Sequence, residues 1–293
     1  MTLVVLLGYL IGAAAGWAFS RNERVEGAWR VIIRTQIILV SVAVSLLAAW
    51  RLTGLSDLVW PLLGGVVGLA LIGAGFLVTP RGADRPGRAV LRSWSALSNG
   101  GFWVIPVATA VAGSPAAVFA VLIDRVYIVI AAFMTWVLRR YAPRQQRMRT
   151  SWVDQAPFIA LGIGLVLNYF SDAPDWTATA LEWCAPLLAM TGMAVFVGSV
   201  LHPSQRIPWR PGVRPWLVLT LVRIGLFLPL AFLAPTTAMH VGFVLLAFSI
   251  PAFFPPQLSI LYGYVDPVVA TAVRWGWIFA PIGIVAAELV FRS

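Results

Sequence analysis

The sequence predicts an all-α membrane protein of ten transmembrane helices, arranged as two inverted five-helix repeats. Three observations predict it: apolar runs long enough to cross a bilayer, arginines concentrated in alternate loops, and a helix-start pattern that recurs in both halves. Of the 293 residues, 60% are apolar and 11% are charged, whereas about a quarter of a soluble domain is charged. A surface so poor in polar groups predicts that lipid, rather than water, solvates most of it.

Ten apolar segments are separated by charged or Pro/Gly-containing breaks. Most approach the roughly 20 residues that a helix needs to cross the hydrocarbon core. The segments are 2–19, 30–50, 57–78, 90–112, 115–138, 155–171, 177–201, 214–234, 238–262 and 266–290. We expect the first to be a transmembrane helix rather than a cleaved signal peptide, because no basic residue precedes it. The longest linker, about 139–154, leaves no room for a soluble domain.

The formal charge of +10 comes from arginine, since all 21 basic residues are Arg. Fifteen lie in one set of alternate loops, whereas the opposite set, with the C-terminus, has only Arg51 and Arg292. Positively charged loops stay in the cytoplasm. We therefore expect a multi-pass protein of the plasma membrane with both termini outside the cytoplasm. A nucleic-acid-binding protein would gather its basic residues on one folded face, so nucleic acid is not expected as a partner.

The chain divides into two blocks of five predicted helices, 1–150 and 151–293. The fifth helix of each block begins alike, as Ser114-Pro-Ala-Ala-Val-Phe-Ala-Val and as Asp266-Pro-Val-Val-Ala-Thr-Ala-Val. Ser or Asp at the N-cap followed by Pro is a helix-start signal. A glycine closely precedes each start, Gly113 in the first block. Because five is odd, the second block is expected to be inverted relative to the first, as in many secondary transporters.

The fourth helix of each block is expected to be interrupted near its middle. The interrupting residues are Asn99, Gly100, Gly101 and Pro106 in the first block and Pro251, Pro255, Pro256 and Gln257 in the second. Glycine forms helices poorly, and proline removes a backbone donor and clashes with the preceding turn. In hydrocarbon, broken helices persist only where protein or a watery cavity satisfies their backbone groups. Matching interruptions predict a substrate-binding site near the bilayer midplane; the alternative is that each Pro or Gly only kinks its helix.

Three ionisable residues fall deep inside the predicted fifth and tenth helices. Asp124 and Arg274 lie about 15 Å and about 12 Å from the starts of their helices, at roughly 1.5 Å per residue, and Arg125 follows Asp124. Charged groups at this depth are costly unless they are paired or hydrated. We expect Asp124 to pair with Arg274 or Arg125, and one arginine to meet an anionic substrate when the pair loosens. A permanent structural ion pair is the alternative.

Other polar residues receive more general expectations. Asn99 is expected to bind a carboxylate together with amides freed at the start of a half-helix; alternatively, it only satisfies backbone groups that the break releases. Arg34 and Arg223 are expected to extend toward the cytoplasmic interface. Glu182 and Glu288 are expected to be solvated near the outer side.

Five stretches of the chain resemble members of the auxin efflux carrier family, whose architecture is shared by the bile acid:sodium symporters. They are Leu97-Ser-Asn-Gly-Gly-Phe-Trp-Val-Ile-Pro106, the stretch from Pro251 to Pro267, Ala156-Pro-Phe-Ile-Ala-Leu-Gly-Ile-Gly-Leu-Val-Leu-Asn168, Ala185-Pro-Leu-Leu-Ala-Met-Thr-Gly192, and Arg223 to Pro229. The resemblance implies ten helices in two inverted blocks, with helices four and nine crossing at the substrate. It also implies an organic anion as cargo, such as a dicarboxylate or an indole acid. The chain departs from its relatives at Phe254, where many have Asn, and in its second helix, which lacks their Pro.

We therefore expect a secondary transporter, or permease, of a small organic anion, in which one five-helix block rocks against the other in alternating access. The expected partners are that anion and the lipid bilayer, with a homodimer as one option for assembly. The sequence has no HExxH, GxSxG, C-x-x-C or phosphate-binding loop, so we expect no enzymatic activity, metal or cofactor. Cys184 is the single cysteine and excludes an internal disulfide. The alternative function is a receptor or structural membrane protein that moves no substrate.

Overall fold

The computed structural model describes residues 1–19, 23–79, 95, 98–139, 156–200, 212–249 and 267–292. Across these ranges the chain is helical and forms no β-strand, which confirms the predicted all-α class. The elements are α1 (Thr2–Phe19), α2 (Glu23–Trp50), the 3₁₀ helix η1 (Leu55–Leu58), α3 (Val59–Val78), the π-helix η2 (Gly100–Val104), α5 (Ile105–Arg139), α6 (Ala156–Phe170), α7 (Trp176–Val200), α8 (Val213–Leu233), α9 (Thr237–Ala247) and α11 (Pro267–Arg292).

Five helical segments of the described chain are long and apolar enough to cross a membrane. They are Ser56–Val78, Gly100–Tyr127, Trp176–Gly198, Val213–Leu233 and Thr271–Arg292. Large apolar side chains lie exposed on the outer faces of the helices, for example Leu10 (66%), Leu77 (67%) and Phe232 (84%). Extended exposed apolar surface marks contact with a membrane or a partner, so the protein is compatible with an integral membrane protein. Four further apolar helices have 10–17 residues, so length and composition single out fewer spans than the ten predicted.

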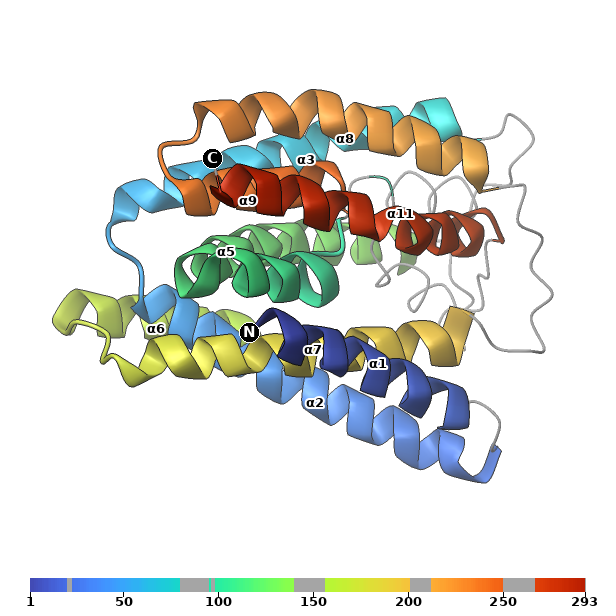
Figure 1. The fold of residues 1–293 in the computed structure, drawn as a ribbon, viewed down its shortest axis with the longest axis horizontal. Helices are drawn as coiled ribbons and strands as arrows, with labels where there is room; N and C mark the ends of the chain where they lie inside the picture. The colour runs from blue at the N-terminus through green and yellow to red at the C-terminus, as the bar shows by residue number, and fades with distance from the viewer. Residues whose placement is uncertain are drawn as a thin grey trace.

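Two helix boundaries show what the sequence pattern did and did not capture. α2 begins at Glu23, seven residues before the predicted start at 30, because backbone hydrogen bonding continues past the point where apolar residues give way to charged ones. The predicted boundary between the fourth and fifth helices is correct. Inside α5, Ala112 (φ −128°, ψ 16°) and Gly113 (φ 69°, ψ −159°) are non-helical. A positive φ favours glycine, and the chain reverses direction at this point (Figure 1).

The helices pack in two groups. The four-helix group consists of α1, α2, α6 and α7, in which α1 packs on α7 and α2 packs on α6. The central group consists of α3, α5, α8, α9 and α11, with α3 packed on α8 and α9 packed on α5, α8 and α11. Figure 1 shows α5 between the four-helix group and the remaining helices of the central group. Each group draws helices from both halves of the sequence, so residues 1–150 and 151–293 do not form separate bodies.

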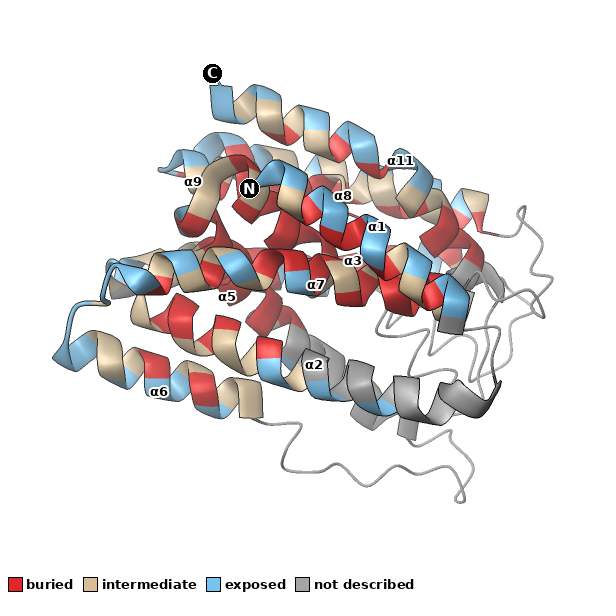
Figure 2. Cartoon of the chain, turned by 60° about the horizontal axis from the view of Figure 1, so that its bottom comes forward, coloured by how far each residue is buried: buried red, intermediate tan, exposed pale blue. Residues whose placement is uncertain are grey.

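The core of the molecule is formed by α9 and the middle of α5. Every residue from Val241 to Ala247 is buried, as expected for a helix that is apolar on all sides. The ring of Phe243 lies 5.0 Å from Phe119 of α5 and 6.3 Å from Phe227 of α8, measured between centroids. Figure 2 shows the buried residues gathered at the centre and the exposed ones on the outer faces of α1, α6 and α11.

Glycines allow α1 to lie directly against α7. At each of three α1 glycines, a Cβ atom would come closer than 3.0 Å to a backbone carbonyl oxygen of α7. The glycines are Gly8, Gly12 and Gly16, and the facing residues are Pro186, Met190 and Ala194. Small residues four apart are a common means of close helix contact in membranes. The contact fixes α1 on α7, and α1 contributes to the site described below.

We expect Gly12→Ala to destabilise the protein by about 2 kcal/mol, because the new methyl group would push α1 away from α7. Thermal unfolding of the purified protein in lipid nanodiscs measures the effect. Gly73→Ala on α3 is the matched control, since nothing lies within 4 Å of its Cβ position. Equal melting temperatures for the two variants would show that the α1–α7 contact is loose.

Candidate functional site

Between helical Ser95 and α5 the backbone is non-helical at Asn99, and we call this point the break. Ser95 is helical, but Asn99 has φ −78° and ψ 68°, outside the helical region. Helical structure resumes as the π-turn η2 and then continues as α5. Single π-turns inside helices are rare and are frequent at functional sites. The residues predicted to interrupt the fourth helix, Asn99, Gly100 and Gly101, therefore lie at an actual break.

Several backbone amides at this break donate to protein acceptors. The amide of Gly100 donates to the carbonyl of Ser98 (2.8 Å), and the amide of Phe102 donates to Oδ1 of Asn99 (3.3 Å). The Trp103 amide donates to the Asn99 carbonyl (3.2 Å). The Gly101 amide faces the carboxylate of Asp124. The amides of Gly100, Phe102 and Trp103 thus have protein acceptors, and the expectation that Asn99 and freed amides bind a carboxylate stays a prediction.

Pro106 lies in the first turn of α5 and leaves one carbonyl without its helical donor. In an α-helix the carbonyl of Phe102 would accept from residue 106, but proline has no N–H. The hydroxyl of Tyr9, on α1, donates to this carbonyl over 2.9 Å. A residue of the four-helix group therefore satisfies a backbone group of the central group.

Several side-chain donors near the break have no partner among the described residues. The amide Nδ2 of Asn99 and the indole Nε1 of Trp103 are buried without a hydrogen bond, and so is Nε of Arg125. Asn99 is 3% exposed and Trp103 is 2% exposed. Since Oδ1 of Asn99 accepts from the Phe102 amide, the opposite end of the side chain must be the NH₂ group. Buried unpaired donors are rare in proteins and call for a ligand, a water or a functional role.

Asp124 and Arg125 lie directly beside the break. The Asp124 carboxylate packs on Gly100, where a Cβ atom would overlap its Oδ1. Nη1 of Arg125 is 3.5 Å from Oδ2 of Asp124, and the two side chains are only 5% and 11% exposed. Of the two partners expected for Asp124, the structure thus brings Arg125 to it. Arg274 is also buried (7%), one turn before Trp277 on α11.

Arg223 corrects an expectation, because it does not extend to the membrane interface. It is fully buried, ten residues into the 21-residue helix α8, which is about 15 Å at the helical rise. Its Nη2 donates to the carbonyl of Ser95 (3.4 Å). The hydroxyl of Tyr127 donates to the carbonyl of Gly64 (3.4 Å). The depth argument that singled out Asp124 in the sequence would also have found Arg223.

An aromatic cluster covers the break on the side of α1, α7 and α11. The ring of Trp277 lies 5.7 Å from Tyr9, 5.8 Å from Trp103 and 5.4 Å from Phe196, measured between centroids. Phe102 packs on α7 at Gly192, which has no side chain to obstruct it. Apolar rings thus pack around Trp103, and small-molecule sites commonly combine a few polar groups with apolar ones.

The second predicted interruption can be followed only in part. Pro251, Pro255, Pro256 and Gln257 lie outside the described residues. The preceding helix, α9, has 11 residues and ends at Ala247, so it spans about 16 Å, roughly half of the hydrocarbon core. α9 contacts the π-turn η2. The first part of the predicted ninth helix therefore lies against the break in the fourth.

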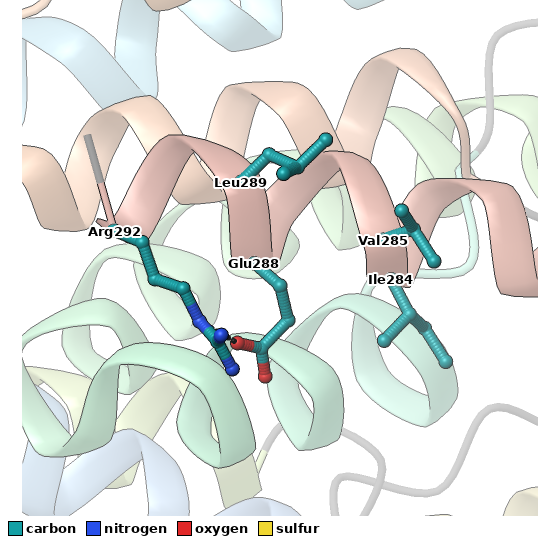
Figure 3. A pocket seen from close by; sticks show the side chains of 5 residues that line it. All are labelled: Ile284, Val285, Glu288, Leu289 and Arg292. Atoms are coloured by element: carbon teal, nitrogen blue, oxygen red, sulfur yellow. Dashed lines mark ion pairs between the residues drawn. The ribbon is translucent and has the colours of Figure 1, made fainter.

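Both glutamates expected to be solvated have partners. Oε1 of Glu182 accepts from the amide of Ser114 (3.2 Å), at the start of the helix that follows Gly113. Glu288 pairs with Arg292 (3.5 Å) at the end of α11, beside a shallow surface depression (Figure 3). The depression is lined by Ile284, Val285, Glu288, Leu289 and Arg292. All of these belong to one helix end and none to the break, so we do not assign the depression to the site.

The break can act as a binding site for a molecule that accepts hydrogen bonds. Its unpaired groups are mainly donors, and the buried charged residues of the described chain are three arginines and one aspartate, namely Arg125, Arg223, Arg274 and Asp124. The described ranges contain no group of three or more His, Cys, Asp or Glu that could hold a metal. No protein-family model matches the chain, and no curated protein matches it.

We expect Gly100→Ala to disrupt the site, whereas Gly101→Ala should be tolerated. A Cβ at residue 100 would overlap the Asp124 carboxylate, while one at residue 101 would meet it at 3.7 Å, an ordinary contact. The overlap should cost about 2 kcal/mol of stability, measured by thermal unfolding. If both variants melt alike, the Asp124 carboxylate does not pack on Gly100.

Proposed function

We propose that the protein is a secondary transporter of a small organic anion that works by alternating access. The observation that carries the proposal is the Nδ2 group of Asn99, a donor that is buried at the helix break without a partner in the described chain. Arg125, which pairs with Asp124, and Arg223, which donates to the carbonyl of Ser95, add positive charge close by. A carboxylate both accepts hydrogen bonds and carries negative charge, so it suits such a set of donors.

The proposed architecture is the ten-helix inverted repeat of the auxin efflux carrier family, which several stretches of the chain resemble. The packing of the helices supports it. In an inverted repeat, α1 corresponds to α6 and α2 corresponds to α7, so the α1–α7 contact should have a counterpart between α6 and α2. Both contacts are extensive. Gly12 and Gly164 are equivalent positions of the two proposed repeats, because they are separated by as many residues as the matching helix starts Ser114 and Asp266. Each of these two glycines lies against the backbone of its partner helix. The arginine distribution favours extracytoplasmic termini in the plasma membrane.

The packing changes which parts are proposed to move. The two sequence halves are interleaved, so we propose that the four-helix group shifts against the central group. Hydrogen bonds across this boundary join Thr2 to the Ala110 carbonyl (3.1 Å), Tyr9 to the Phe102 carbonyl (2.9 Å) and Glu182 to the Ser114 amide (3.2 Å). A shift between the groups would exchange these bonds and uncover the break. Binding of an anion there can bias the two arrangements only if it favours one of them.

Reconstitution in liposomes tests the transport proposal. We expect the protein to move benzoate or succinate down an imposed gradient, and Asn99→Ala to slow this flux by about tenfold, the effect of losing one hydrogen bond to a charged group. Asn168→Ala is the control, since Asn168 Nδ2 only bonds the carbonyls of Trp50 and Leu52 (2.7 Å each). Binding without flux would favour a receptor, and the absence of both would end the proposal.

Arg223→Gln should weaken benzoate binding to the purified protein by about tenfold, because a buried positive charge near the break is lost. Isothermal titration in nanodiscs measures the affinity, after thermal unfolding has shown that the variant is folded. Arg214→Gln provides the comparison, since Arg214 is exposed in the first turn of the same helix. Equal affinities for the two variants would remove Arg223 from the site.

A further inference from the structure

The position that an anion would take at the helix break is already occupied by a carboxylate of the chain itself. The helix that starts at Gly100 continues through η2 and α5 to the bend at Ala112. The start of a helix carries partial positive charge and directs its amides toward an anion. Asp124 lies against this start, because its Cβ, Cγ and Oδ1 are the nearest atoms to the place that a Cβ of residue 100 would take.

The contact between Asp124 and the break depends on glycine. Any Cβ at residue 100 would lie within about 3 Å of the Asp124 side chain, including its stem. The amide of Gly101 faces the same carboxylate. The backbone at the break is therefore shaped to receive one carboxylate group, and in this structure the group comes from α5.

A second donor at the same helix start is unoccupied. Asn99 is 3% exposed, and its Nδ2 has no partner within the described ranges. Because its Oδ1 is held by the Phe102 amide, the NH₂ group is fixed at the N-terminal end of this helix. Asp124 thus leaves the Asn99 NH₂ group without an acceptor, which an added anion could supply.

Arg125 gives Asp124 a partner other than the helix start. The two residues form an ion pair (3.5 Å), and Nε of Arg125 is buried with no hydrogen bond in the described part of the chain. A carboxylate that leaves the Gly101 amide can strengthen its bonds to Arg125, so it is not left as an isolated buried charge. Leaving a buried charge unpaired would be far more costly.

We propose that Asp124 is a built-in ligand, which competes with the carboxylate of an organic anion for the helix start at Gly100 and so sets the affinity of the site. The inference rests on the proposed function, because it presumes that an organic anion visits the break. It assigns Asp124 as an affinity-determining residue rather than as a group that attracts the substrate.

Titration of the full-length protein in nanodiscs with benzoate tests the competition. Asp124→Asn keeps the size of the side chain but removes its charge, so benzoate should bind about tenfold more tightly than to the unmodified protein. Asp172→Asn, a change at an exposed acid, should leave the affinity unaltered. Unchanged or weaker binding by Asp124→Asn overturns the proposal.

A second measurement asks whether a small carboxylate binds where the Asp124 side chain has been removed. In Asp124→Ala the Gly101 amide loses its carboxylate, so acetate should raise the melting temperature of this variant saturably. Acetate should have no such effect on the unmodified protein or on Asp172→Ala. An equal response of all three proteins, or none from Asp124→Ala, overturns the assignment of a carboxylate position.

If benzoate binds neither the unmodified protein nor Asp124→Asn, the organic-anion function fails and this inference fails with it. If benzoate binds the unmodified protein and Asp124→Asn equally well, the competition by Asp124 is wrong but the organic-anion function stands.

Discussion

A helix that is interrupted in an apolar environment must satisfy its backbone polar groups without bulk water, and the surroundings of Asn99 follow from this constraint. The Asn99 side chain bonds the Phe102 amide, Asp124 faces the Gly101 amide, and Tyr9 supplies the donor that Pro106 cannot. Glycine at residue 100 leaves the space that Asp124 fills. Among the described residues, Nδ2 of Asn99 and Nε1 of Trp103 are side-chain donors at the break that are buried without a hydrogen bond.

The same contacts link the break to the packing of the whole molecule. Tyr9 is held in place because the glycines of α1 let that helix lie against α7, and its hydroxyl reaches across to the central group. Glu182 of α7 similarly bonds the amide that follows the reversal at Gly113. The boundary between the two groups is therefore closed by a shared apolar core, by a few hydrogen bonds and by aromatic packing around Trp277.

Local signals in the sequence were sufficient to predict the helical class, the break at Asn99 and the reversal at Gly113, because Gly and Pro act on the backbone where they stand. The depth of Asp124 was also readable from helix length. The sequence did not indicate that Asp124 packs on Gly100, that Tyr9 bonds the Phe102 carbonyl, or that the two halves interleave. These contacts join residues distant along the chain. The expectation that Arg223 extends to the cytoplasmic interface was wrong, because its depth within its helix matters more than its distance in sequence from the arginine-rich loop.

The central claim is that an anion binds the unpaired amide of Asn99, and nuclear magnetic resonance of the ¹⁵N-labelled asparagine side chains tests it most directly. The chain has three asparagines, so the signals can be assigned with single substitutions. The account predicts that benzoate shifts the Asn99 side-chain resonance saturably and leaves that of Asn168 in place, while tetraethylammonium shifts neither. An Asn99 resonance that is indifferent to benzoate and to succinate would contradict the account.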